Sequence, residues 1–143
     1  MPKPMTRNEF LQYLDYFNSK SYENIVSYFA DDCEFIYATE WTLEPQVKKS
    51  FKGKDAFIEH YKEVHETFNE TIKLGAFMST EDTIIAEVFT LFEAEKEGDI
   101  RAGHFMPGEK FYMNQYIDYS LDENGKFTLV RIAQFQTLDP ATA

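Results

Sequence analysis

Helix-forming and strand-forming segments occupy different parts of this chain, and their order constrains the fold more than any other feature. Two amphipathic helices are expected first, over Glu9–Asn18 and Tyr22–Asp31. A strand-like run, Cys33–Thr39, and a third helix, Asp55–Phe68, come next, and the remaining residues are strand material. Helices that precede a run of strands pack on one face of an antiparallel sheet. The sequence therefore predicts an α+β fold.

Four strand segments follow the third helix: Thr71–Ser79, Thr83–Glu95, His104–Leu121 and Phe127–Thr137. Asn124-Gly125 lies between the last two, and this pair tolerates the positive φ of a tight hairpin turn. The segment Glu40–Lys52 has no period and is expected to be a loop. Its Trp41 either contacts a ligand as part of a lid or folds back over the edge of the core.

Composition limits the partners of this chain. A length of 143 residues suits one domain, which we expect to span residues 1–143. The formal net charge of −11 disfavours nucleic acid and anionic membranes, and no membrane-spanning or signal segment is expected. With Cys33 as the one cysteine, no disulfide is expected within the chain. These features predict a soluble, cytoplasmic protein.

The two faces of the long strand differ in chemistry, because alternate residues of a strand point to opposite sides. In Phe111–Leu121 the odd positions are almost wholly apolar. The even positions carry a hydroxyl, amide or carboxylate group: Tyr112, Asn114, Tyr116, Asp118 and Ser120. We expect the even row to line a pocket. The alternative is that the even row is a solvated outer face.

The assignment of the even row to a pocket has consequences for both faces of the sheet. The odd row, which includes Met113, Ile117 and Tyr119, is then expected to contact a second subunit in a homodimer. Further pocket-wall residues are expected on neighbouring strands, namely Val88, Ile132 and Gln134. Arg131 is on the other face of the last strand from Ile132 and is expected to be out of reach of Asp118.

Three stretches together resemble the nuclear transport factor 2-like superfamily, and within it the SnoaL-like polyketide cyclases and ketosteroid isomerases. They are Tyr13–Phe35 (YLDYFNSKSYENIVSYFADDCEF), Gly53–Tyr61 (GKDAFIEHY) and Ile117–Arg131 (IDYSLDENGKFTLVR). The resemblance implies a cystatin-like cone, in which a curved antiparallel sheet with a mixed edge wraps around the long third helix. It also implies a deep conical cavity and a homodimer through the outer face of the sheet.

The resemblance to the steroid isomerases assigns roles to individual residues. Tyr13 falls at the tyrosine of the oxyanion hole, and Asp118 falls at its partner, an aspartic acid that is kept protonated. The general base of that family falls at Tyr37, and a phenol is a poor base at neutral pH. His60, on the flank of the third helix's apolar stripe, is therefore the candidate base. Its alternative role is that of a partly buried structural histidine.

These residues lead to one functional hypothesis and one alternative. The hypothesis is a pocket for a small hydrophobic carbonyl compound, with isomerase, lyase or cyclase activity and no cofactor. Tyr13 and Asp118 polarise the carbonyl, Asn114 and Tyr116 orient it, and His60 moves a proton. No metal is expected, because His60 and His65 point about 140° apart on a helix. The alternative is a non-catalytic module of the same fold that binds a ligand or a protein.

Overall fold

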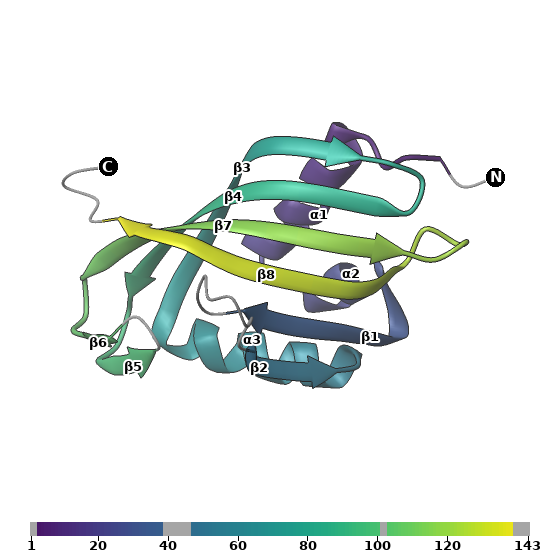
Figure 1. Cartoon of the computed structure of the whole chain (residues 1–143). Helices are drawn as coiled ribbons and strands as arrows, with labels where there is room; N and C mark the ends of the chain where they lie inside the picture. Colours follow the sequence, from purple (N-terminus) through teal and green to yellow (C-terminus); the bar gives the residue numbers. More distant parts are fainter. Residues whose placement is uncertain (1–2, 39–46, 101–102, 139–143) are drawn as a thin grey trace.

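A six-stranded sheet and three helices make up most of the molecule (Figure 1). The computed structural model describes residues 3–38, 47–100 and 103–138. The helices are α1 (Arg7–Asn18), α2 (Tyr22–Val26) and α3 (Lys54–Thr67). The strands of the large sheet are β1 (Phe29–Ala38), β2 (Val47–Lys52), β3 (Phe68–Ser79), β4 (Thr83–Ala94), β7 (Lys110–Leu121) and β8 (Phe127–Leu138).

The large sheet has the order β2-β1-β8-β7-β4-β3 and a small hairpin is formed by β5 (Gly98–Ile100) and β6 (Gly103–Phe105). Strand β1 pairs with β8 in parallel, and the other pairs of the large sheet are antiparallel. The helices lie on one side of this curved sheet, with α3 beside β1 and β2 and α1 behind β3 and β4 (Figure 1). The predicted α+β fold with a mixed sheet is confirmed.

Helix α1 begins where the sequence signals a start. The Thr6 hydroxyl accepts a hydrogen bond from the Glu9 backbone N–H at 3.1 Å, and the Glu9 carboxylate accepts one from the Thr6 N–H at 3.1 Å. This reciprocal pair satisfies two N–H groups that the first turn leaves without a helical partner. The buried residues of the helix form one stripe facing the sheet: Phe10, Tyr13, Leu14 and Phe17.

Helix α2 is shorter than expected, and strand β1 begins earlier. The sequence pattern predicted helix up to Asp31, but α2 ends at Val26 and β1 begins at Phe29. Phe29 pairs with Phe127 of β8, and the Phe127 N–H donates to the Tyr28 carbonyl at 2.8 Å. Pairing with a strand distant in the sequence therefore overrides the local helical periodicity, which carries no information about that partner.

Strand β2 lies inside the segment that was expected to be a loop. Its sequence, VKKSFK, is rich in lysine and pairs with β1 on one side as an edge strand. Edge strands commonly carry lysine, which discourages pairing with other molecules. A strand is recognised in a sequence by the alternation of apolar and polar residues, and these lysines obscure it. The prediction of a loop up to Lys52 was therefore wrong.

The face assignment of β7 was also wrong. The odd residues Met113, Ile117 and Tyr119 are buried on the side of the helices, whereas Tyr116 is 42% exposed on the other side. The register explains the result, because Tyr119 pairs with Ile84 and Ile117 pairs with Ala86, and both partners are fully buried. Paired residues share a face of the sheet. The alternative, with the even row on the outer face, is the one observed.

Candidate functional site

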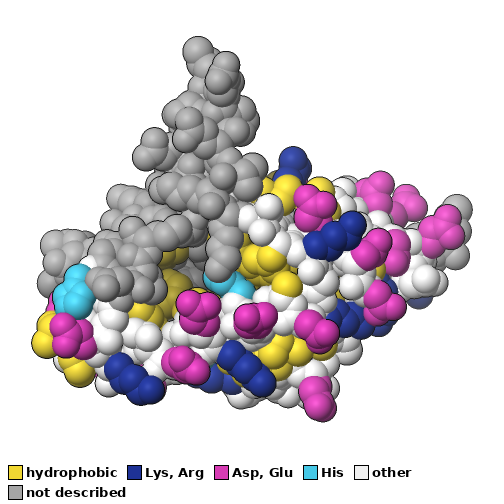
Figure 2. All heavy atoms as spheres, turned by 90° about the horizontal axis from the view of Figure 1, so that it is seen from below, with side chains coloured by type: hydrophobic (Ala, Val, Ile, Leu, Met, Phe, Trp, Pro, Cys, Tyr) yellow, Lys and Arg dark blue, Asp and Glu magenta, His cyan; other side chains and the backbone are white. Residues whose placement is uncertain are grey.

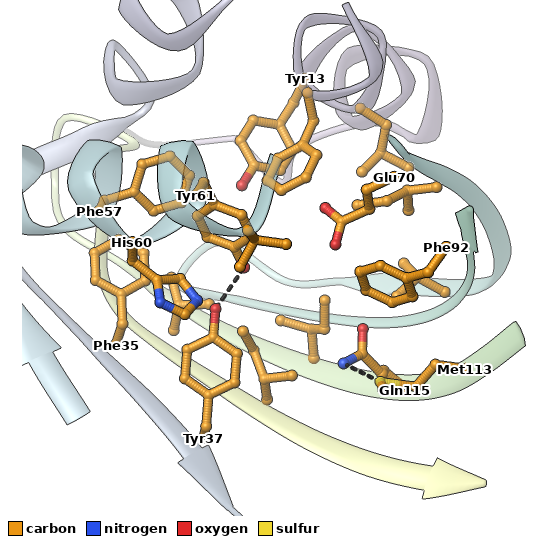
Figure 3. Close-up of a pocket in the computed structure, with 18 of the residues that line it drawn as sticks. Tyr13, Phe35, Tyr37, Phe57, His60, Tyr61, Glu70, Phe92, Met113 and Gln115 are labelled. Carbon is orange, nitrogen blue, oxygen red and sulfur yellow. Dashed lines mark hydrogen bonds between the residues drawn. The ribbon is translucent and has the colours of Figure 1, made fainter. Parts of the chain in front are cut away.

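A cavity of about 410 Å³ lies between the concave face of the sheet and helices α1 and α3 (Figure 3). Most of its lining is apolar or aromatic, and the polar groups are few: four phenols, His60, Gln115, Thr67, Glu63 and Glu70. A largely apolar lining with a few polar groups, in a volume of a few hundred cubic ångströms, is typical of small-molecule sites.

Two buried phenols form the first polar group of the cavity. Tyr13 of α1 and Tyr119 of β7 are 4% and 2% exposed, and their rings lie edge to face with centroids 6.2 Å apart. Burial raises the pKa of Tyr13 well above its usual value, and the Tyr119 phenol adds to the effect. Burial also raises the pKa of Tyr119. Both side chains therefore stay neutral and keep their O–H donors at neutral pH.

A second pair of phenols lies across the cavity. The Tyr37 and Tyr61 hydroxyl oxygens are 2.5 Å apart, which joins β1 to α3 (Figure 3). Burial raises the pKa of Tyr61 well above its usual value, and the nearby Tyr37 phenol contributes. Tyr37, which the resemblance places where the steroid isomerases carry a carboxylate, is thus hydrogen-bonded to a second phenol.

His60 of α3 lines the same cavity and lies among aromatic rings. Its ring centroid is 4.8 Å from Tyr61, 5.0 Å from Phe51 and 5.4 Å from Tyr37. The imidazole points toward the cavity beside the Tyr37 hydroxyl (Figure 3). Tyr13, Tyr37 and His60 therefore line one cavity, and the roles assigned to them from the sequence stay predictions.

The buried carboxylate of Glu70 was missed by the sequence reasoning. Its side chain is 6% exposed, and its Oε1 lies 3.5 Å from the Nε2 of His65, whose side chain is 5% exposed. On the other side of the imidazole, Nδ1 lies 2.6 Å from the Tyr22 hydroxyl. In the part of the chain that the structure describes, neither Glu70 Oε1 nor His65 Nε2 has a hydrogen-bond partner within bonding geometry.

A sequence signal for Glu70 exists. The row Phe68, Glu70, Ile72 and Leu74 follows the two-residue period of a strand, so a carboxylate interrupts an inward-facing apolar row. A charged residue in such a row is either paired or functional. His65 was considered only as a metal ligand, and its position one turn before the start of β3 was not used.

Three predicted site residues lie outside the cavity, on the outer face of the sheet. Asp118 forms an ion pair with Arg131, its partner across the β7–β8 pair. The prediction that Arg131 is out of reach was therefore wrong, because cross-strand partners share a face. The Tyr116 hydroxyl donates to Glu87 at 3.1 Å, and the Asn114 amide lies 3.4 Å from the same carboxylate. An oxyanion hole of Tyr13 with Asp118 is not formed.

The remaining predicted binding residues divide into two groups. Val88 and Ile132 line the cavity. Gln134 lies in β8 opposite Gln115, but its side chain is outside the described part of the structure, and Trp41 lies outside the described residues altogether.

Neither a metal site nor a membrane span is found within the ranges that the structure describes. No group of three or more His, Cys, Asp or Glu side chains there is arranged to hold a metal ion. None of the helices described is long and apolar enough to cross a bilayer. Cys33 is fully buried, and burial raises its pKa to about 12.

No family model and no curated protein matches the sequence. Solved structures do match. A SnoaL-like polyketide cyclase from Agrobacterium tumefaciens is 14% identical, with a TM-score of 0.67 over 92% of this chain and 93% of that one. A Mycobacterium tuberculosis protein in complex with estradiol-17β-hemisuccinate is 15% identical, with a TM-score of 0.63 over 84% and 85%. An NTF2-like protein from Burkholderia xenovorans is 13% identical, with a TM-score of 0.60 over 86% and 83%. The fold of this chain is thus the one shared by NTF2-like proteins and SnoaL-like cyclases.

Proposed function

We propose that this chain binds a compact hydrophobic molecule through a carbonyl or phenol oxygen and acts on it as an isomerase, lyase or cyclase without a cofactor. The observation that carries the proposal is the buried Tyr13–Tyr119 pair in a cavity of about 410 Å³. The apolar lining supplies affinity for a hydrophobic skeleton, and the few polar groups select its orientation.

The two phenols are suited to hold an oxygen atom that gains negative charge. Burial raises the pKa of Tyr13 and of Tyr119, so both are donors at neutral pH. Donors preorganised in an apolar site stabilise a developing oxyanion without having to reorganise during the reaction. Tyr119 takes the role that the sequence analysis gave to Asp118, because it shares the cavity with Tyr13.

Support for a hydrophobic ligand also comes from the structural comparisons. The Mycobacterium tuberculosis protein with this fold was crystallised with a steroid derivative, estradiol-17β-hemisuccinate. At 15% identity that ligand belongs to the other protein, but it is a hydrophobic phenol of the class that we propose here.

Binding of 2-naphthol tests the proposal, since this phenol resembles the enol of a compact bicyclic ketone. We expect isothermal titration calorimetry to detect binding, and Tyr13→Phe to weaken it about tenfold through loss of one hydrogen bond. Tyr119→Phe removes the second donor and is expected to have a similar effect. Tyr116→Phe is the matched control, because that phenol is on the outer face. Equal affinity of all four proteins, or no binding, would contradict the proposal.

We also propose a homodimer through the outer face of β4 and β7. Three large side chains are exposed there, Ile85 at 42%, Phe89 at 37% and Tyr116 at 42%. The residues first expected in this interface, Met113, Ile117 and Tyr119, are instead buried within the chain. Exposed apolar side chains gathered on neighbouring strands are typical of protein–protein contacts. We expect sedimentation velocity to show a dimer at micromolar concentration.

A further inference from the structure

We propose that Glu70 is the proton acceptor of the cavity, that His65 and Tyr22 position it, and that the substrate is a ketone with an acidic C–H bond next to its carbonyl. The inference rests on the proposed function and specifies its chemistry. It replaces His60, the residue that the sequence favoured for this role.

The position of Glu70 is the first argument. Its carboxylate points into the cavity from the start of β3, toward the space between Tyr13 and Phe92 (Figure 3). Only 6% of the side chain is exposed. Among the described residues its one ion-pair contact is the 3.5 Å approach of His65 Nε2, and Oε1 is left without a hydrogen-bond partner. Such an unsatisfied buried oxygen is costly, and a ligand proton in the cavity would satisfy it.

The contacts of His65 are the second argument. Its Nδ1 lies 2.6 Å from the Tyr22 hydroxyl, and the two rings are stacked with centroids 5.9 Å apart. When the Tyr22 O–H donates to Nδ1, the imidazole is neutral and its proton is on Nε2, which faces Glu70. Burial raises the pKa of Tyr22 and the charge of Glu70 raises it further, so Tyr22 keeps its donor.

This arrangement places an imidazole beside the carboxylate without a hydrogen bond between them. His65 Nε2 lies 3.5 Å from Glu70 Oε1, and neither atom has a hydrogen-bond partner among the described residues. A lysine or arginine at the same place would hold the carboxylate in a strong charged pair. We infer that His65 and Tyr22 are positioning residues and that Glu70 keeps an oxygen available for a proton.

His60 differs from Glu70 in its surroundings. It is half-buried and packed among the rings of Tyr37, Phe51 and Tyr61. These contacts suit a wall residue that shapes the cavity.

Charged side chains are spread over the surface on the α3 side of the molecule, with apolar side chains showing between them (Figure 2). Glu63, which also lines the cavity, is exposed, and Glu70 is the buried carboxylate of its lining.

The proposed step is a proton transfer that needs no co-reactant. A Glu70 oxygen takes a proton from the carbon next to the carbonyl, and the C–H electron pair forms the C=C bond of an enolate. The C=O π pair moves to oxygen, where the Tyr13 and Tyr119 hydroxyls donate hydrogen bonds. Glu70 then returns the proton to the same carbon, or to another carbon of the conjugated system, which gives an isomer.

Hydrogen exchange of 2-tetralone in D₂O, followed by proton NMR with the full chain, tests this step without the natural substrate. We expect the wild type to accelerate loss of the α-proton signals. Glu70→Gln should reduce the enzymatic rate by about 10²–10⁴-fold, the usual contribution of a general base. The matched control is Glu66→Gln, an exposed carboxylate on α3, and its rate should equal that of the wild type.

Binding of 2-naphthol separates loss of the base from loss of the fold. After the transfer Glu70 is neutral and the enolate is negative, so Gln resembles the protonated acid. Glu70→Gln should therefore bind 2-naphthol as tightly as the wild type or more tightly, while its exchange is lost. Glu70→Asp shortens the side chain by one methylene and should lower kcat with KM nearly unchanged. This second variant tests the proposal if Glu70→Gln folds poorly.

The positioning of Glu70 by His65 and Tyr22 is tested by measuring kcat and KM for exchange in variants of these two residues. His65→Leu removes the N–H that faces Glu70 and should lower kcat for exchange about tenfold with KM unchanged. His65→Gln retains an N–H donor and should recover part of that loss. Tyr22→Phe should lower kcat in the same way as His65→Leu. A change in melting temperature with kcat unchanged would assign these residues a structural role only and overturn their positioning role.

The outcomes distinguish this inference from the proposed function. Normal exchange in Glu70→Gln together with loss in His60→Gln would make His60 the acceptor and overturn the inference, while the proposed function stands. Binding of 2-naphthol by a wild type that exchanges no 2-tetralone protons would indicate a non-catalytic binding protein and would also overturn it. Failure of the wild type to bind either compound would contradict the proposed function itself.

Discussion

At the scale of single residues, three phenols of the cavity should make the fold less stable at alkaline pH. Burial raises the pKa of Tyr13, Tyr61 and Tyr119 above the value of an unfolded tyrosine. A folded pKa above the unfolded one means that the stabilisation is complete below about pH 10 and is lost as pH rises from there through the folded pKa. We expect the free energy of unfolding to fall above pH 10 by about 1.4 kcal/mol per pH unit for each phenol.

Urea unfolding between pH 8 and pH 11 measures this slope, and absorbance at 295 nm reports phenol ionisation in the same samples. Tyr61→Phe removes one of the titrating groups and should make the slope shallower. Stability that is constant up to pH 11 would show that these phenols ionise as readily in the folded chain as in the unfolded one.

At the scale of elements, the capping box gives α1 a defined start. Thr6→Ala deletes the hydroxyl that accepts from the Glu9 N–H and should lower the free energy of unfolding by about 1 kcal/mol. The comparison is Ser21→Ala at the start of α2, where the side chain makes no capping hydrogen bond and its hydroxyl only accepts a bond from the Asn24 amide at 2.7 Å. Chemical denaturation of the two variants compares them. An equal loss in both would mean that the cap of α1 contributes no more than that side-chain hydrogen bond.

At the scale of the whole molecule, the proposed dimer makes the outer face of the sheet an interface. Phe89→Glu puts a charge among Ile85 and Tyr116 and should convert the proposed dimer to a monomer in sedimentation velocity. Met106→Glu is the control, because Met106 is 47% exposed and lies between β6 and β7 rather than within β4 or β7. A monomeric wild type, or a Phe89→Glu variant that stays dimeric, would contradict the proposed interface.

The fold could be predicted from local patterns, and part of the cavity lining from the family resemblance. The capping box, the turn at Gly125 with φ of 74°, and the apolar stripe of α1 depend on residues close in the sequence. The resemblance pointed to Tyr13, Tyr37, His60 and Asp118 as site residues; the first three line the cavity and Asp118 does not, and the roles of the three stay predictions. Glu70 and His65 were missed because their contact joins the end of α3 to the start of β3, and neither residue forms a motif by itself.

The sequence alone determined that this chain forms an α+β fold and that β7 has one apolar and one polar face. Only the tertiary structure decided which face is inside, because an alternating pattern is the same whichever side the helices cover. The choice follows from the pairing of β7 with β4, which places Tyr119 and Ile117 beside the buried Ile84 and Ala86. That pairing brings Tyr119 into the cavity and leaves Asp118 on the outer face. Register between distant strands, which no local pattern encodes, thus determined the chemistry of the site.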